Sequence, residues 1–152
     1  MKFANVDEIL DFAISNEEKA FDFYMSLATK AKRPAMSEAF EEFAAEEEKH
    51  KTKLLAVKSG KKIEASIGGK TTDLKLSDYL VDIEPSPDME YQDALIVAMK
   101  MEKAAFRLYS DLAANTDDTG LKDLFLSLAQ EEAKHKLRFE LEYDENVHQG
   151  LY

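Results

Sequence analysis

Four stretches of the chain alternate apolar and polar residues with the period of an α-helix. In each stretch a heptad can be followed, with steps of three and four residues that keep its members on one face of the helix. We call these four faces the inner faces. They contain Leu10, Ala13, Glu17, Ala20, Tyr24, Leu27 and Ala31; Met36, Phe40, Phe43, Glu47, His50, Leu54 and Val57; Tyr91, Leu95, Ala98, Glu102, Ala105, Tyr109 and Leu112; and Leu121, Phe125, Leu128, Glu132, His135 and Phe139. The pattern predicts four long helices that pack through their inner faces as a bundle.

Short breaks separate the helices within each half of the chain. Asn5 is placed to cap the first helix, residues 32–34 interrupt the pattern before the second, and residues 115–120 form the turn into the fourth. Ser86 and Pro87 predict a cap and a first-turn proline for the third helix. Because both connections are short, we expect the first helix to lie antiparallel to the second, and the third to the fourth.

The middle of the chain, about residues 59–87, breaks the helical pattern. Glycines and prolines interrupt it at Gly60, Gly68, Gly69, Pro85 and Pro87. A connection this long needs a structural reason. At roughly 3.3 Å per extended residue it can run the length of a bundle. Residues 74–81 predict a short helix or strand on the outside.

The predicted fold is therefore all-α and forms a single domain over residues 1–152. It is a four-helix bundle of two repeated antiparallel hairpins, at about 5–58 and about 88–146. One long crossover, at about 59–87, joins the hairpins.

The second half of the sequence repeats the first at a constant offset of 85 residues. Glu17, Ala20, Phe21, Tyr24, Phe40, Ala44, Glu47, Lys49 and His50 recur as Glu102, Ala105, Phe106, Tyr109, Phe125, Ala129, Glu132, Lys134 and His135. Each half thus contains an isolated Glu, followed 30 residues later by Glu-x-x-His. The repeat supplies four Glu and two His, a full ligand set for two metal ions.

All six of these ionisable residues fall on inner faces. Burying an unpaired carboxylate costs free energy, and four together also repel one another. Two divalent cations would compensate the four charges, and a Glu and a His at i, i+3 can reach a shared ion. The alternative is that each Glu is one of 31 acidic residues that falls there by chance. Two Glu-x-x-His patterns in matching register favour the metal site.

Composition excludes several other classes of protein. The net charge of −11 argues against a nucleic-acid partner, because phosphates need clustered Lys and Arg. The chain has no Cys, so disulfides, zinc–thiolate sites and cysteine-ligated iron–sulfur clusters are excluded. No run of 18 apolar residues predicts a membrane span, and the first ten residues lack the pattern of a signal peptide. We therefore expect a cytoplasmic protein.

The helical segments resemble those of a known family. Residues 17–24 and 102–109, together with 40–50 and 125–135, are similar to the rubrerythrin branch of the ferritin-like di-iron carboxylate proteins. The resemblance covers all four helices but not the crossover, and it implies a ferritin-like bundle. It implies the following site residues: Glu17 and Glu102 as terminal ligands, Glu47 and Glu132 as bridging ligands, His50 and His135 on one iron each, and Tyr24 and Tyr109 as donors to ligand carboxylates. An equally good interpretation of the two tyrosines is that they are core aromatic residues whose hydroxyls are hydrogen-bonded elsewhere.

The chain departs from the usual rubrerythrin pattern in two respects. Without Cys it has no rubredoxin domain, and it resembles shorter members that receive electrons from a separate protein. Typical rubrerythrins also have an additional Glu three residues after the ligand of the third helix, where this chain has Ala105. The six-residue ligand set remains.

The resemblance implies a peroxide reductase. We expect hydrogen peroxide to be reduced at a carboxylate-bridged pair of iron ions, with electrons from an external donor such as a rubredoxin. Manganese or zinc also suit this ligand set. One alternative is a ferroxidase that feeds iron storage, or an oxygen-scavenging protein. Another is a non-enzymatic helical interaction module that binds metal structurally. Since proteins of this family commonly pair, we expect a homodimer, and the long crossover leaves room for helices to be exchanged between the subunits.

Overall fold

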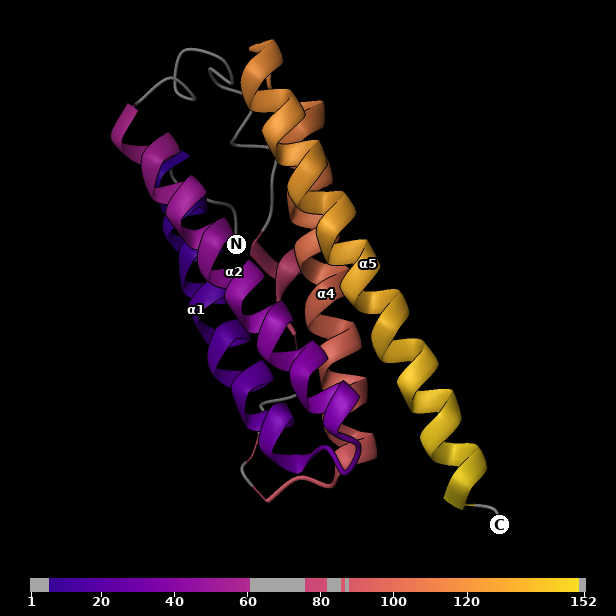
Figure 1. The fold of residues 1–152 in the computed structure, drawn as a ribbon. Coiled ribbons are helices and arrows are strands. Elements are labelled where there is room, and N and C mark those ends of the chain that lie inside the picture. The colour runs from indigo at the N-terminus through magenta and orange to yellow at the C-terminus, as the bar shows by residue number, and fades with distance from the viewer. Residues whose placement is uncertain (1–5, 61–75, 82–85, 87, 151–152) are drawn as a thin grey trace.

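The computed structural model describes residues 6–60, 76–81, 86 and 88–150 (Figure 1). It contains the helices α1 Val6–Lys30, α2 Pro34–Gly60, α4 Tyr91–Ala114 and α5 Thr119–Gly150, and the short 3₁₀ helix η2 Leu76–Tyr79. Over these ranges there is no strand, which agrees with the predicted all-α class. None of the helices in this part of the chain is long and apolar enough to cross a membrane.

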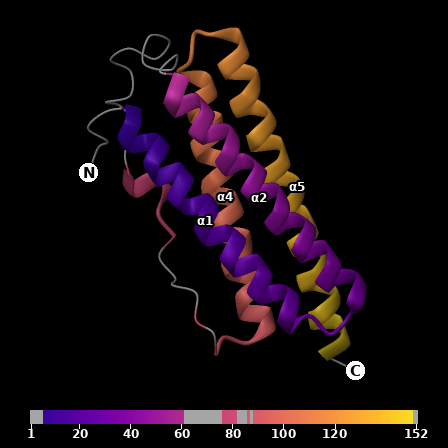
Figure 2. The same ribbon diagram turned by 60° about the vertical axis from the view of Figure 1, so that its left-hand side comes forward.

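The helices pack as two hairpins. α1 makes its most extensive contacts with α2, and α4 with α5, while α1 and α4 form the main contact between the hairpins. Within each hairpin the two helices run antiparallel, and the four axes lie nearly side by side (Figures 1 and 2). The four-helix bundle predicted from the heptads is confirmed.

The two short turns have the predicted positions. α1 ends at Lys30, and Pro34 occupies the first position of α2. A backbone N–H at this position would have no hydrogen-bond partner within the helix, so proline is well suited to it. Before α5, the Oδ2 atom of Asp118 accepts a hydrogen bond of 2.9 Å from the backbone N–H of Leu121. This is the geometry of an N-cap, and it satisfies one of the free N–H groups of the first turn.

The predicted start of α4 was wrong. α4 begins at Tyr91, with Glu90 rather than Ser86 at the N-cap position. Ser86 closes a separate turn, because its carbonyl accepts from the N–H of Met89 at 3.1 Å and its hydroxyl accepts from the N–H of Asp88 at 3.3 Å. Ser86 thus has the hydrogen-bonding chemistry of a cap, but it serves a turn. Asn5 and Pro87 lie outside the described residues.

Part of the crossover rests on the second hairpin. η2 contacts α4, and the side chain of Tyr79 is 2% exposed. Its hydroxyl donates a hydrogen bond of 2.7 Å to Oδ2 of Asp111. The expected helix or strand over 74–81 is thus a single 3₁₀ turn, while residues 74 and 75 lie outside the described part of the chain.

Two apolar clusters fill the bundle, one towards each end. The first joins the start of α1 to the ends of α2 and α4 and the start of α5; it contains Ile9, Leu10, Leu54, Leu112 and Phe125. The second joins the other ends of the same helices and contains Leu27, Met36, Phe40, Leu95 and Phe139. Between them lies a layer of buried charged residues.

Candidate metal centre

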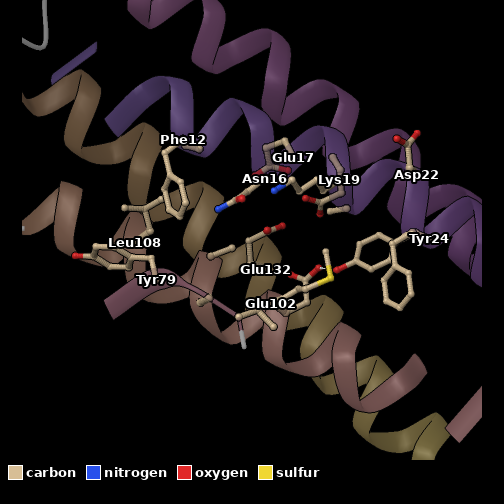
Figure 3. Close-up of a pocket in the computed structure, with 18 of the residues that line it drawn as sticks. Phe12, Asn16, Glu17, Lys19, Asp22, Tyr24, Tyr79, Glu102, Leu108 and Glu132 are labelled. Carbon is tan, nitrogen blue, oxygen red and sulfur yellow. Dashed lines mark hydrogen bonds between the residues drawn. The ribbon is translucent and has the colours of Figure 1, made fainter. Parts of the chain in front are cut away.

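The buried charged layer consists of the six residues predicted from the repeat. Their exposed fractions are 2% for Glu17, 0% for Glu47, 1% for His50, 1% for Glu102, 2% for Glu132 and 2% for His135. Glu17, Glu102 and Glu132 point towards one another from α1, α4 and α5 (Figure 3). The inner faces place these side chains here because each lies at a core position of its heptad.

The six residues form two groups, each able to surround one metal ion. The first contains Glu17, Glu47, His50 and Glu132, and the second contains Glu47, Glu102, Glu132 and His135. Within a group, one ligand atom of each residue lies within 4.8 Å of the others. Ligands at about 2.0–2.2 Å from a shared ion stand roughly 3–4 Å apart, so the groups are close to a binding geometry.

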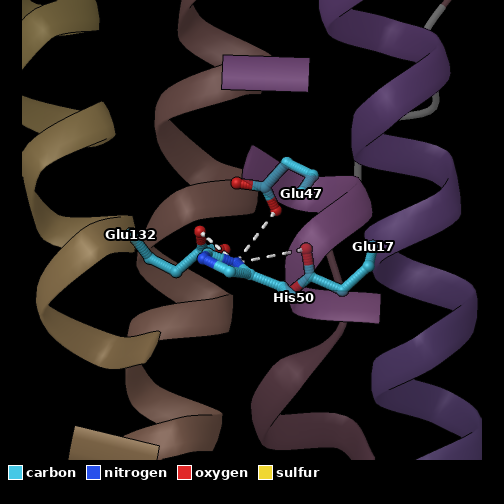
Figure 4. A group of neighbouring side chains, drawn as sticks. All are labelled: Glu17, Glu47, His50 and Glu132. Carbon is cyan, nitrogen blue, oxygen red and sulfur yellow. Dashed lines mark ion pairs between the residues drawn. The ribbon is translucent and has the colours of Figure 1, made fainter. Parts of the chain in front are cut away.

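In the first group, Nδ1 of His50 faces three carboxylates. It lies 3.7 Å from Oε2 of Glu17, 3.8 Å from Oε2 of Glu47 and 3.3 Å from Oε1 of Glu132. Figure 4 shows these side chains converging from α1, α2 and α5. The imidazole therefore points a ligand atom into the carboxylate cluster.

The second group mirrors the first. Nδ1 of His135 lies 3.0 Å from Oε1 of Glu47, 3.6 Å from Oε1 of Glu102 and 3.7 Å from Oε1 of Glu132. Glu47 turns one carboxylate oxygen towards each histidine, and Glu132 lies near both. Glu47 and Glu132 are thus common to the two groups.

The buried charged layer contains polar atoms that have no hydrogen-bond partner within the described part of the chain. They are Oε2 of Glu17, both carboxylate oxygens of Glu47, Nδ1 of His50, Oε2 of Glu102, Oε1 of Glu132 and Nδ1 of His135. Buried polar atoms are nearly always paired, because an unpaired one costs about 1–3 kcal/mol. These atoms belong to the residues of the two ligand groups, and they are the atom types that bind divalent cations. The residues therefore fit a pair of metal ions.

In the absence of metal, burial and mutual repulsion favour the protonated forms of Glu47 and Glu102. Burial, and then the charges of Glu132, Glu102 and Glu17, raises the pKa of Glu47 well above its usual value. Burial and the charge of Glu132 raise the pKa of Glu102 to about 8. A cation in the layer would replace these protons.

The pKa values of His50, His135 and Glu17 shift in the direction that favours the charged form of each side chain. Burial opposes the charge of His50, but the adjacent carboxylates of Glu132 and Glu17 outweigh it and raise the pKa of His50 to about 11. For His135, the adjacent carboxylate of Glu102 outweighs burial and raises the pKa to about 9. Burial is likewise outweighed at Glu17, where the neighbouring Glu47 and His50 lower the pKa.

Two tyrosines donate hydrogen bonds between the hairpins to Glu102 and Glu17. The hydroxyl of Tyr24 donates to Oε1 of Glu102, and the hydroxyl of Tyr109 donates to Oε1 of Glu17. Burial, together with the neighbouring carboxylates, raises the pKa of both tyrosines well above 10, so both keep the proton that they donate. Each hydroxyl holds one oxygen of its Glu in place. The other oxygen of Glu17, Oε2, faces Nδ1 of His50, whereas Oε1 of Glu102 both accepts from Tyr24 and lies 3.6 Å from Nδ1 of His135.

Two further residues of the centre were not predicted from the sequence. Nε2 of His50 donates to Oε2 of Glu131, and Nε2 of His135 donates to Oε2 of Glu46. Such a carboxylate sets the tautomer of a metal-binding imidazole and directs its other nitrogen towards the ion. The signal was present, because Glu46 and Glu131 are themselves related by the offset of 85 residues.

The sequence matches that of a known family. The family model for rubrerythrin matches residues 8–143. This chain belongs to the rubrerythrin family. The ferritin-like di-iron fold expected from the resemblance is therefore confirmed, and residues 8–143 cover both hairpins and the crossover.

Two solved structures share this fold. A hypothetical protein from Pyrococcus furiosus is 29% identical, with a TM-score of 0.74 over 93% of this chain and 89% of that one. A protein from Thermotoga maritima, provisionally named a ferritin-like diiron-carboxylate protein, is 18% identical, with a TM-score of 0.75 over 96% of this chain and 99% of that one. No curated protein matches the sequence.

Proposed function

We propose that this rubrerythrin-family protein reduces hydrogen peroxide at a carboxylate-bridged pair of iron ions, with electrons from an external donor. The observation that carries the proposal is the sharing of Glu47 and Glu132 by two ligand groups. Sharing of ligands brings two ions close together, as the two halves of a peroxide require. Two separate structural metal sites would not need shared ligands.

The six residues would have distinct tasks at this centre. Glu47 and Glu132 would bridge the ions, while Glu17 with His50 and Glu102 with His135 would complete one ion each. When bound, a pair of iron ions supplies two electrons, one from each ion, together with positive charge that polarises the peroxide. Manganese and zinc fit the same donor atoms, but only a metal with two accessible oxidation states supplies the electrons.

The remaining residues would control orientation and water. Tyr24 and Tyr109 keep the terminal carboxylates in place and retain their own protons. The apolar clusters on either side, which include Leu54 and Phe40, cover the centre towards the two ends of the bundle. A preorganised polar site in apolar surroundings stabilises developing charge more strongly than water does.

The test is an anaerobic iron(II) titration, followed by rapid mixing of the loaded protein with peroxide or with oxygen. We expect two irons per chain, oxidised much faster by hydrogen peroxide than by oxygen. Glu132→Gln should lose iron binding and oxidation together, whereas Glu48→Gln, on the exposed face of α2, should retain both. Failure of the native protein to bind iron would refute the proposal.

A second candidate is a ferroxidase. The six-residue set, with Ala105 in place of an additional carboxylate, favours it because no seventh oxygen ligand is supplied at that position. Oxidation by oxygen that exceeds oxidation by peroxide, together with a multi-subunit shell in solution, would select this function. A small assembly would argue against storage.

A further inference from the structure

A cavity of about 510 Å³ lies beside the candidate metal centre, between α1, α4 and the crossover. Four carboxylate residues of the centre line it, namely Glu17, Glu47, Glu102 and Glu132. Neither histidine does. The cavity thus reaches the centre from its carboxylate side, and Figure 3 shows Glu17 and Glu132 at its middle, with Phe12 and Leu108 to one side.

Away from the carboxylates, most of the cavity wall is apolar. α1 contributes Phe12 and Ala13, and α4 contributes Ala104 and Leu108. The crossover covers the space with Tyr79, Leu80 and Val81. Charged Lys19 and Asp22 also border the cavity, but both are exposed on α1.

Small side chains explain why the space remains open. Ala20 follows Glu17 by one helical turn, and Ala105 follows Glu102 in the same way. Alanine at both positions leaves no side chain to fill the gap between α1 and α4 next to the carboxylates. Since protein interiors are close-packed, an open apolar space of this size has a ligand as its natural occupant.

The size of the cavity exceeds what hydrogen peroxide or oxygen needs. Each is comparable to one or two water molecules, at roughly 30 Å³ per water. Pockets of about 300–1,000 Å³ hold organic molecules, and their walls are mainly apolar with a few directed polar groups. This cavity has that composition, with its polar groups gathered where the metal pair would lie.

We propose that the cavity binds the alkyl chain of an organic hydroperoxide, with the hydroperoxide group directed towards Glu17 and Glu102. The proposal rests on the proposed function and names a substrate class for it. The alkyl chain would lie against Ala104, Leu108 and Leu80. The hydroperoxide would meet the centre between the two terminal carboxylates, which the tyrosines hold in place.

The reaction balances as a two-electron reduction of one O–O bond. One hydroperoxide, two protons and two electrons give one alcohol and one water. The oxygen attached to carbon leaves as the alcohol, and the outer oxygen leaves as water. Both electrons come from the reduced metal pair, and a one-electron donor protein replaces them in two steps.

The first test measures binding without any redox chemistry. The alcohol product is unreactive, so 1-butanol, 1-hexanol and 1-octanol are titrated into the metal-free protein by calorimetry. If the chain enters an apolar cavity, each added methylene should tighten binding about fourfold. Affinity that does not depend on chain length would overturn the proposal.

Substitutions then locate the binding. Ala104→Leu, which fills the cavity, should weaken the binding of 1-octanol at least tenfold. Ala56→Leu, the same change at an exposed position of α2, should leave the affinity unchanged. Leu80→Gln provides a second variant, because Leu80 is 58% exposed and its replacement cannot unfold the bundle. This variant should weaken the binding of 1-octanol about fivefold. Unchanged affinity in both cavity variants would refute the assigned site.

A single-turnover experiment tests the substrate class. Iron-loaded, reduced protein is mixed rapidly with hydrogen peroxide or with 1-octyl hydroperoxide. The octyl compound should oxidise the native protein faster at low concentration, and Ala104→Leu should reduce that preference at least tenfold. Octanol binding with no reaction of either peroxide would overturn the hydroperoxide assignment together with the proposed function. Rapid reaction of hydrogen peroxide alone would overturn the organic hydroperoxide as substrate and leave the proposed function intact.

Discussion

Glu131 on α5 accepts a hydrogen bond from Nε2 of His50 on α2, so a carboxylate from the second hairpin orients an imidazole from the first. The other imidazole nitrogen, Nδ1, then faces the buried carboxylates. The repeat supplies the reciprocal pair, in which Glu46 on α2 orients His135 on α5. Each candidate ligand group therefore depends on both hairpins.

Removal of one of these outer carboxylates should affect one metal ion more than the other. We expect Glu131→Ala to weaken the ion held by His50 about 10–100-fold, since the imidazole loses its fixed orientation. The ion held by His135 should change less. Competition with a chelator, followed over both binding steps, measures the two affinities. Glu48→Ala, at an exposed position on α2, is the matched control, and equal loss at both steps would contradict the orienting role of Glu131.

The tyrosine hydroxyls should stabilise the fold as well as the centre. Tyr109→Phe removes the hydrogen bond to the buried Glu17, so the free energy of unfolding should fall by about 1.5–3 kcal/mol. Tyr91 offers the control, because its buried hydroxyl has no hydrogen-bond partner among the residues that the structure describes. Urea unfolding of Tyr91→Phe should therefore show a change below about 0.5 kcal/mol. A similar loss in the two variants would mean that the removal of a buried hydroxyl, and not the loss of its bond to Glu17, lowers the stability.

Neutralising Glu47, which is common to the two candidate ligand groups, should separate stability from metal binding. Glu47 is fully buried among like charges, so Glu47→Gln should leave the metal-free protein at least as stable as the native protein. Metal at 100 times its dissociation constant should stabilise the native protein by about 2.7 kcal/mol, and this gain should disappear in the variant. Thermal unfolding with and without manganese(II) gives both quantities. Marked destabilisation of metal-free Glu47→Gln would show that the carboxylate has a structural role.

The stability of the metal-free protein should fall as pH rises. The pKa of Glu102 is about 8 in the folded protein, above its ordinary value of 4.5, and the pKa of His135 is about 9 instead of 6.5. Between about pH 4.5 and 9 the folded state therefore holds more protons than the unfolded state, and stability decreases with pH. We expect a lower melting temperature at pH 8.5 than at pH 5.5. A rise over this range would contradict the raised pKa values of Glu102 and His135.

Metal should reverse much of that pH dependence. Metal binding requires deprotonated carboxylates and neutral imidazoles, so loading at pH 7 should release protons, and affinity should increase with pH. Calorimetric titrations of manganese(II) in two buffers of different ionisation enthalpy count the protons released. Loading without proton release would show that Glu47 and Glu102 are already ionised.

Much of this protein could be predicted from local pattern. The heptads indicated the inner faces because a helix repeats its faces every three to four residues, whatever lies opposite. Glu17, Glu47 and His50 were found because they interrupt an apolar face, and their counterparts because the halves repeat. Burial of charge is costly enough that such interruptions require a partner.

Other features could be recognised only once the arrangement of the helices was known. Ser86 has the right residue type for a helix cap, but a local turn uses it, and α4 begins at Tyr91. Glu46 and Glu131 lie one position away from the inner faces, and they look like ordinary surface acids until α2 and α5 are placed opposite each other.

The sequence by itself determined the helices, their inner faces and the set of six buried ionisable residues, because helical periodicity and the cost of burying charge act locally. The tertiary structure alone decided which carboxylates are shared, which acids orient the histidines, and that a cavity remains between Ala20 on α1 and Ala105 on α4. These relationships join residues from different helices. They depend on how far apart the helices pack, and no local pattern fixes that distance.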